Sequence, residues 1–174
     1  ILEKGGQWFL EQGRPNNGGP KLFSVSGHVN RPDNFEVPLG TPFRDLLEMA
    51  GGVRDGKKLK AVIPGGSSVP VVPGDVMMET DIVMADGTDM VKVLANRSHF
   101  YSHESCGQCT PCREGTGWLS RVLHRVLHGQ GRPEDLDLLD SVAGRIGGRT
   151  ICALGDAAAM PVQSFLKHYR PEFE

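Results

Sequence analysis

The sequence predicts an α+β protein, in which a small mixed β-sheet with one helix is followed by an antiparallel four-helix bundle. Three observations support this. Apolar and polar residues alternate from Leu22 onward, which is typical of a half-buried strand. From Thr88 onward, apolar residues return at every third or fourth position, which is typical of amphipathic helices. Residues 13–20 are rich in Gly, Pro and Asn and indicate a linker. We therefore divide the chain into residues 1–20, 21–87 and 88–174.

The first two regions are expected to hold short elements. Gly5 and Gly6 interrupt residues 1–12, where we expect a short helix. Thr41 has the form of an N-cap before a helix with one buried face, and a proline follows it at the first helical position. Strands are predicted around 22–29, 35–37, 59–63, 69–72 and 81–85. Residues 65–68, Gly-Gly-Ser-Ser, resemble a phosphate-binding loop, but the Lys-Ser/Thr pair and the helix of such a loop do not follow.

Four amphipathic helices are expected in the third region. Thr88 and Asp89 can cap the first of them, and Pro133 with two acids opens the third. None of the helices can bury its apolar stripe alone, so short connections imply an antiparallel bundle. The expected buried positions are Met90, Val91, Leu94, Ser98 and Tyr101, then Trp118, Leu119, Val122, Leu123, Val126 and Leu127, then Leu136, Leu139, Ala143 and Ile146, and finally Val162, Phe165, Leu166 and Tyr169.

All four cysteines fall in this region. Cys106, Cys109 and Cys112 are spaced three residues apart, and Cys152 lies in a later connection. A 4Fe-4S cluster needs four thiolates, of which a run with this spacing can supply three. Gly107 permits close approach of the backbone, and we expect Pro111 to keep the loop out of a helix. Loop N–H groups, helix N-termini and the neighbouring Arg113 would stabilise negative charge on a cluster.

Other interpretations of the cysteines remain open. Zinc is bound more often by two separate pairs of ligands, and disulfides are uncommon in the cytosol. A Cys-x-x-Cys redox pair would leave the third cysteine and the missing βαβ context unexplained. We expect His103 to be exposed or to contact a ligand of the cluster without binding the metal itself. His124 and His128 are expected to be ordinary polar residues. The remaining polar expectations are Asp156 as a helix cap and Arg121, Arg125, Lys167 and Arg170 as a solvated or partner-facing surface.

The composition excludes several classes of function. A formal net charge of −2 gives no reason to expect nucleic acid or an anionic membrane as partner. No apolar run approaches the roughly 20 residues that span a bilayer, so no direct membrane insertion is expected. The first residues do not have the pattern of a secretion signal, which leaves the cytoplasm as the default location. The absence of an initiator Met suggests a piece of a longer protein.

Two stretches resemble a known family. Residues 104–115, ESCGQCTPCREG, and 151–156, ICALGD, are similar to the C-terminal part of the flavin-binding subunit of respiratory complex I, NADH:quinone oxidoreductase. Residues 21–29, KLFSVSGHV, and 63–68, IPGGSS, resemble the soluble-ligand-binding β-grasp domain of that subunit. Flavin subunits of NAD-linked hydrogenases and formate dehydrogenases share this layout and are the nearest alternative.

The resemblance implies an electron relay. In this family NADH reduces FMN, and the flavin passes single electrons to a 4Fe-4S cluster. The ligands of that cluster map onto Cys106, Cys109, Cys112 and Cys152, and Ala153 and Leu154 become candidate flavin contacts. The main FMN and NAD site is absent from these residues, so we expect no catalytic residues here, and residues 1–20 would be the end of a preceding flavin domain and a linker.

The resemblance also implies partners and a location. The partners would be other subunits of the peripheral arm, especially a small iron-sulfur subunit, on the cytoplasmic or mitochondrial matrix side of the inner membrane. The stretch from Val71 to Ala85 is shorter than the family leads us to expect. The alternative from a different class is an interaction module held together by a four-cysteine zinc site.

Overall fold

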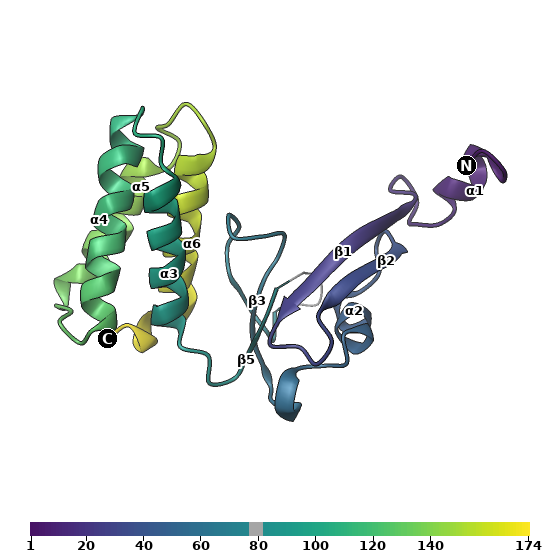
Figure 1. Cartoon of the computed structure of the whole chain (residues 1–174), viewed down its shortest axis with the longest axis horizontal. Coiled ribbons are helices and arrows are strands. Elements are labelled where there is room, and N and C mark those ends of the chain that lie inside the picture. The colour runs from purple at the N-terminus through teal and green to yellow at the C-terminus, as the bar shows by residue number, and fades with distance from the viewer. Residues whose placement is uncertain (77–81) are drawn as a thin grey trace. The chain divides into compact units, whose positions relative to one another are not determined.

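A computed structural model describes residues 1–76 and 82–174 and divides the chain into two compact units (Figure 1). The sheet unit consists of Ile1–Pro64 and Pro73–Gly87, and the helical unit of Gly65–Val72 and Thr88–Glu174. Residues 77–81 lie outside this description, and with them Asp81, the first residue of the strand predicted at 81–85.

The described strands form one mixed sheet with the order β2-β1-β5-β3-β4. β1 pairs antiparallel with β2, with Phe23 opposite Phe35, and it pairs in parallel with β5. β3 pairs antiparallel with β5. The predicted mixture of parallel and antiparallel pairing is therefore present. The strands are β1 (Pro20–Gly27), β2 (Asp33–Pro38), β3 (Leu59–Ile63), β4 (Val72–Pro73) and β5 (Ile82–Ala85), so the fourth predicted strand, at 69–72, is reduced to Val72–Pro73.

The helices of the sheet unit are short. α1 (Gly5–Leu10) buries none of its side chains, α2 (Phe43–Met49) buries Phe43 and Leu46, and a single 3-10 turn covers Arg54–Gly56. The prediction of Thr41 as N-cap is wrong, because that position is taken by Pro42. The Thr41 hydroxyl instead donates to the carbonyl of Pro38 at 2.7 Å, which closes the turn before the helix.

The helical unit consists of four long helices, α3 (Met90–Glu104), α4 (Thr110–Leu127), α5 (Glu134–Ile146) and α6 (Leu154–Tyr169), followed by a 3-10 turn at Arg170–Glu172. Successive helices contact each other, and α3 also contacts α6 (Figure 1). The connections are short, so each helix runs back along the one before it. The α3–α4 and α5–α6 connections therefore lie at the same end. The core is made of Leu94, Leu119, Leu123, Leu139, Ile146, Val162 and Phe165.

The structure confirms one predicted feature of these helices and contradicts two. Asp89 caps α3 as expected, since its Oδ1 accepts the Lys92 N–H at 2.9 Å. The expectation that Pro111 keeps the cysteine loop out of a helix is wrong, because α4 already begins at Thr110. Proline is tolerated in a first turn, where its missing N–H would have no helical partner. The prediction of Trp118 as a core residue is also wrong, since 51% of it is exposed.

Residues 65–72 belong to the helical unit because polar groups hold them against its helices. The Val71 N–H donates to the buried Ser164 hydroxyl at 3.0 Å, and Ser67 Oγ lies 3.0 Å from the Tyr101 hydroxyl. Arg97 Nη2 donates to the Val69 carbonyl at 3.4 Å. Burial lowers the pKa of Arg97 to about 10, although the charge of Tyr101 acts in the opposite direction.

Replacing Ser164 with alanine should destabilise the helical unit. The Val71 N–H would then stay buried without its acceptor, a loss that costs about 1–3 kcal/mol. The free energy of unfolding in urea measures this loss. Ser141→Ala, an exposed position on α5, is the matched control and should change stability by less than about 0.5 kcal/mol. Equal effects of the two substitutions would contradict the role of Ser164.

A partly buried ion pair joins α4 to the start of α5. Arg125 binds both carboxylate oxygens of Asp135, which also accepts the Arg132 N–H at 2.9 Å. Burial acts to raise the pKa of Asp135, but the hydrogen bonds and the charges of the two arginines outweigh it, and the pKa ends below its ordinary value of 3.8. Arg125, which is expected as a solvated or partner-facing surface residue, keeps 35% of its side chain exposed but is paired with Asp135.

The depressed pKa of Asp135 predicts a pH dependence of stability. Its contribution is complete above the ordinary aspartate pKa and is lost as the pH falls through the folded value, because protonation then favours the unfolded chain. Asp135→Asn should lower the free energy of unfolding by about 1–3 kcal/mol at pH 7 and flatten its decline in acid. Urea unfolding at several pH values tests this, with the exposed Asp140→Asn as control. An unchanged pH slope in Asp135→Asn would contradict it.

Candidate metal centre

The four cysteines lie in or beside two helix connections. Cys106 is exposed in the α3–α4 connection, and Cys109 is the half-buried N-cap of α4. Cys112 is buried in the first turn of that helix. Cys152 is exposed in the α5–α6 connection, two residues before α6 begins. All four thiols are free.

One hydrogen bond shows that these connections meet. The Ile151 N–H donates to Cys109 Sγ at 3.4 Å across 42 residues of sequence. Ile151 is the residue before Cys152, so the remote cysteine is brought next to the three-cysteine run. This proximity is a requirement for all four cysteines to serve one metal centre.

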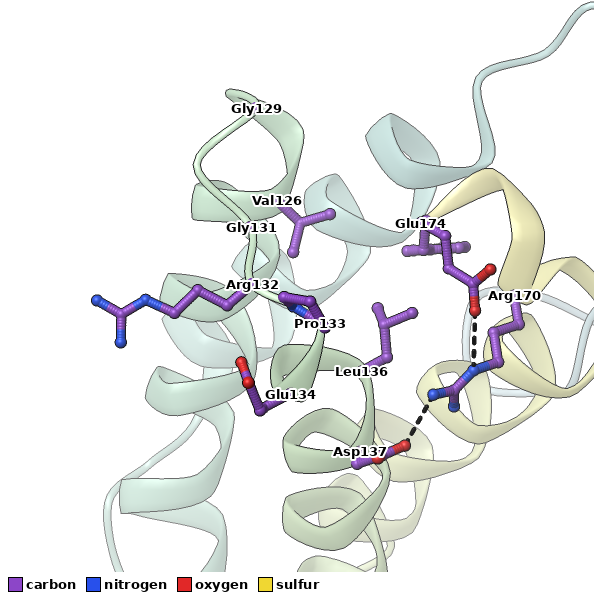
Figure 2. A pocket seen from close by; sticks show the side chains of 11 residues that line it. Val126, Gly129, Gly131, Arg132, Pro133, Glu134, Leu136, Asp137, Arg170 and Glu174 are labelled. Carbon is purple, nitrogen blue, oxygen red and sulfur yellow. Dashed lines mark hydrogen bonds and ion pairs between the residues drawn. The ribbon is translucent and has the colours of Figure 1, made fainter.

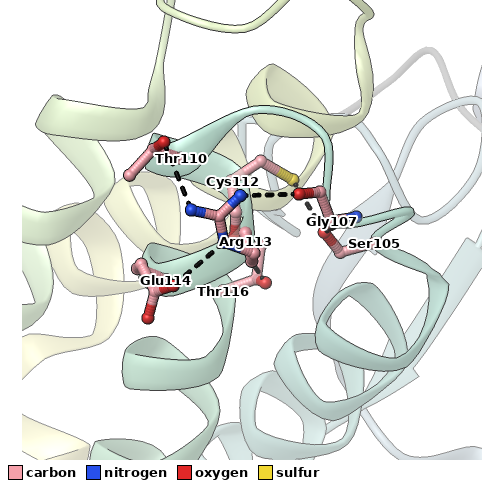
Figure 3. A network of polar contacts seen from close by, with 7 residues as sticks. All are labelled: Ser105, Gly107, Thr110, Cys112, Arg113, Glu114 and Thr116. Atoms are coloured by element: carbon pink, nitrogen blue, oxygen red, sulfur yellow. Dashed lines mark hydrogen bonds and ion pairs between the residues drawn. The ribbon is translucent and has the colours of Figure 1, made fainter.

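A network of polar contacts shapes the first loop (Figure 3). The Gly107 N–H donates to Ser105 Oγ at 3.4 Å, and Ser105 Oγ lies 3.3 Å from Cys112 Sγ. The Arg113 side chain reaches back to the Gly107 carbonyl at 2.8 Å. Gly107 has a φ of +78°, a conformation that glycine adopts without strain. The sequence pattern points to Gly107 and to the charge of Arg113 but gives no sign of Ser105.

The second loop is held by three residues of its own. Thr150 Oγ1 donates to the Cys152 carbonyl at 2.8 Å. The prediction of Asp156 as a helix cap is wrong, because Ala153 is the N-cap of α6 and Asp156 lies in the first turn. Asp156 instead accepts the Gly148 N–H at 2.7 Å and so ties the loop to α6. Gly155 lies against Thr150, and a Cβ added to it would stand 2.6 Å from Thr150 Cγ2. In the sequence, only the presence of a glycine at position 155, close to Cys152, indicates this packing.

This donor set fits an iron-sulfur cluster. α4 and α6 both begin at the cysteine loops, and the positive ends of helix dipoles stabilise thiolates and the negative charge of a reduced cluster. Among the described residues, no three His, Cys, Asp or Glu side chains are close enough to hold one metal ion. A four-iron cluster does not need such a group, because each of its irons takes one cysteine.

Of the other residues singled out in the sequence, three lie next to a cysteine loop, and the two histidines His124 and His128 lie at the other end of α4. Ala153 is exposed and is the N-cap of α6, and Leu154 is half-buried in the first turn of that helix. His103 is exposed and contacts Glu104 at 3.1 Å. His124 and His128 are exposed along α4, with ring centroids 4.1 Å apart.

The described part of the helical unit has a hollow away from the cysteines and a smaller one at the start of α4. The larger, of about 800 Å³, lies beside the α4–α5 connection and the chain end (Figure 2). Arg170 contacts both Asp137, at 2.8 Å, and Glu174, at 3.4 Å, so these three charged side chains of its wall are paired with one another. The smaller hollow, of about 270 Å³, is apolar and is bordered by Pro111 and Trp118.

Comparison with known proteins identifies the family. Residues 92–174 match the model of the NADH-ubiquinone oxidoreductase-F iron-sulfur binding region, and residues 22–72 match the SLBB domain. The whole chain is 50% identical to part of an NADH-quinone oxidoreductase subunit of Rhizobium meliloti and covers 45% of that protein. Over its whole length, the chain is similar to one part of the flavoprotein subunits of NADH-quinone oxidoreductases. The resemblance seen in the sequence is confirmed, and so is a 4Fe-4S cluster as the cofactor of residues 92–174.

A mitochondrial protein and a solved hydrogenase structure are also similar to this chain. The mitochondrial NADH dehydrogenase [ubiquinone] flavoprotein 1 of Dictyostelium discoideum is 49% identical over the whole chain, which covers 40% of it. The NAD+-reducing [NiFe]-hydrogenase in its H2-reduced state is 28% identical, with a TM-score of 0.86 over 99% of this chain and 32% of that one. The α+β class is confirmed by this likeness. The chain thus spans less than half the length of these relatives.

This chain and the Rhizobium protein differ in length within the matched region. The match with the Rhizobium protein extends over 194 residues, more than the 174 of this chain, so the relative carries residues within the matched part that this chain does not have.

Among the helices of the described residues, none is both long and apolar enough to cross a bilayer.

The packing of Gly155 against Thr150 predicts a sensitive position. Gly155→Ala should displace Thr150 and the loop that carries Cys152, destabilising the helical unit by about 1–3 kcal/mol and lowering iron retention. Gly144→Ala on α5 is the matched control, since its nearest neighbour would be 4.0 Å away and alanine favours a helix by up to about 1 kcal/mol. Urea unfolding and iron content measure both. A stable, fully loaded Gly155→Ala protein would refute the packing argument.

Proposed function

We propose that this chain is the electron-relay part of an NADH:quinone oxidoreductase flavin subunit, and that Cys106, Cys109, Cys112 and Cys152 each bind one iron of a 4Fe-4S cluster. The observation that carries the proposal is the hydrogen bond from the Ile151 N–H to Cys109 Sγ, because it brings the only remote cysteine beside the other three. The match of residues 92–174 to an iron-sulfur binding region supports it independently.

The residues around the cysteines favour this chemistry. A bound 4Fe-4S cluster accepts and releases one electron at a time. The Ser105 hydroxyl can donate to a Cys112 thiolate, and the Ile151 N–H donates to Cys109. Both contacts stabilise negative charge on sulfur and therefore favour the reduced state. Burial of Cys112 keeps water away from one side of the site, whereas the exposed Cys106 and Cys152 leave the other side accessible to an electron donor or acceptor.

The rest of the relay would come from outside these residues. In the proposed whole protein, NADH reduces FMN in a separate domain, and Ala153 and Leu154 at the start of α6 contact the flavin. Other subunits of a peripheral arm, including a small iron-sulfur subunit, would receive the electrons on the cytoplasmic or matrix side of the membrane. The proposed architecture is a β-grasp domain over residues 21–87 and an antiparallel four-helix bundle over 88–174, after a flavin-domain remnant and linker at 1–20.

A hydrogenase-type subunit is the second candidate. The likeness to the NAD+-reducing hydrogenase, with a TM-score of 0.86, favours it as an alternative assembly for the same relay. The identity of 50% to the Rhizobium quinone oxidoreductase subunit, against 28% to the hydrogenase, favours the first candidate. Both candidates assign the same role to the four cysteines.

Metal analysis of the reconstituted chain tests the cluster ligands. After anaerobic reconstitution with iron and sulfide, we expect about four irons per chain and a broad visible absorbance that dithionite bleaches. Alanine at any one of the four cysteines should lower the iron content and change the EPR spectrum of the reduced protein. His103→Gln is the matched control, because this exposed side chain lies beside the loop and is not proposed as a ligand.

The same measurements separate the relay from a zinc module. A preparation that holds one zinc, no iron and no sulfide, with no bleaching on reduction, would refute the relay. A fully loaded cluster in Cys152→Ala would refute the assignment of that ligand.

A further inference from the structure

We propose that Arg113 is a positioning residue that holds the loop between Cys106 and Cys109 in the shape that binds the cluster. This rests on the proposed function, because it concerns how the same four cysteines receive the metal. The role would come from the geometry of the guanidinium group, and its positive charge would contribute little.

The position of Arg113 allows it to reach the loop. It follows Cys112 in α4, and its side chain turns back toward the start of the helix (Figure 3). Nη1 donates to the Gly107 carbonyl at 2.8 Å, and Nη2 donates to Thr110 Oγ1 at 3.4 Å. One planar group therefore joins the middle of the loop to the first residue of the helix. Arginine can do this because its donors form a rigid fork.

The loop has few other constraints. Residues 106–108 form no regular secondary structure, and Gly107 has no side chain to pack. Within the described part of the chain, the backbone of these residues makes two hydrogen bonds, from the Gly107 N–H to Ser105 Oγ and from Arg113 to the Gly107 carbonyl. The second is the shorter of the two, at 2.8 Å against 3.4 Å. Because Gly107 directly follows Cys106 and lies two residues before Cys109, fixing its carbonyl restricts the direction of both thiols.

The charge of Arg113 is largely compensated. Its Nε donates to Glu114 Oε1 at 3.0 Å, and the two side chains are 47% and 58% exposed, respectively. An exposed, paired cation contributes little to a field at a nearby group, since water and counterions screen it. Removal of the fork should therefore matter more than removal of the charge.

Two substitutions separate these effects. Arg113→Lys keeps the charge but not the fork, and Arg113→Gln removes both. We expect both reconstituted proteins to lose iron to a chelator about tenfold faster than the unsubstituted chain, the lower end of the usual loss when a partner of a metal ligand is removed. The EPR signal of the reduced cluster should broaden in both. The helical circular dichroism of the metal-free chain should not change, because Arg113 is exposed and, within the described residues, its side chain hydrogen-bonds only to Gly107, Thr110 and Glu114.

Arg121→Gln is the matched control, because Arg121 is an exposed arginine two turns further along α4. It should retain iron as the unsubstituted chain does. The proposal is overturned if Arg113→Lys retains iron and its EPR signal normally, since charge alone would then be sufficient. It is also overturned if both Arg113 variants lose helical signal without metal, because the side chain would then support the helices. If the unsubstituted chain binds no cluster, the proposed function fails first.

Discussion

The candidate site depends on two helix connections that end at the same place. Four helices that run alternately up and down put the α3–α4 and α5–α6 connections at one end, and the contact between Ile151 and Cys109 records their meeting. One turn of helix advances the chain by about 5.4 Å, so an added or missing turn in α5 would carry Cys152 away from the other cysteines. The buried side chains that fix the register of the helices, such as Leu119 and Ile146, therefore also determine the ligand geometry.

Charge and burial are distributed unequally around the four sulfurs. Cys112 is buried and lies beside the Ser105 hydroxyl, whereas Cys106 and Cys152 are exposed. Helix N-termini lie next to the cysteines of both loops, and their dipoles favour negative charge. A cluster in this setting would be stabilised from the protein side by hydrogen-bond donors and would remain open on the other side. An electron carrier needs this combination, because it must be held firmly and still be approached by its partners.

The Asp89 cap could be predicted because it depends on neighbouring residues, and the strands of the sheet because apolar and polar residues alternate along them. The polar contacts that shape the site could not. Asp156 binds Gly148 and Arg113 binds Gly107 across turns whose path is set by tertiary packing. The prediction for Trp118 fails because an apolar residue at helical spacing need not face the core, and that for Pro111 because its tolerance in a first helical turn outweighs its effect on Thr110.

Hydrogen bonds hold both cysteine loops in place without a bound metal. Fixing the backbone of one residue costs about 1–2 kcal/mol, and a free loop of several residues would take this from the free energy of cluster binding. Each cysteine loop here is already tied by a polar side chain from the helix that follows it, Arg113 for the first loop and Asp156 for the second. Both side chains bind backbone atoms of a glycine, so they restrain the chain where it has the most freedom to move. Cluster assembly would then need mainly local adjustment of the four thiols.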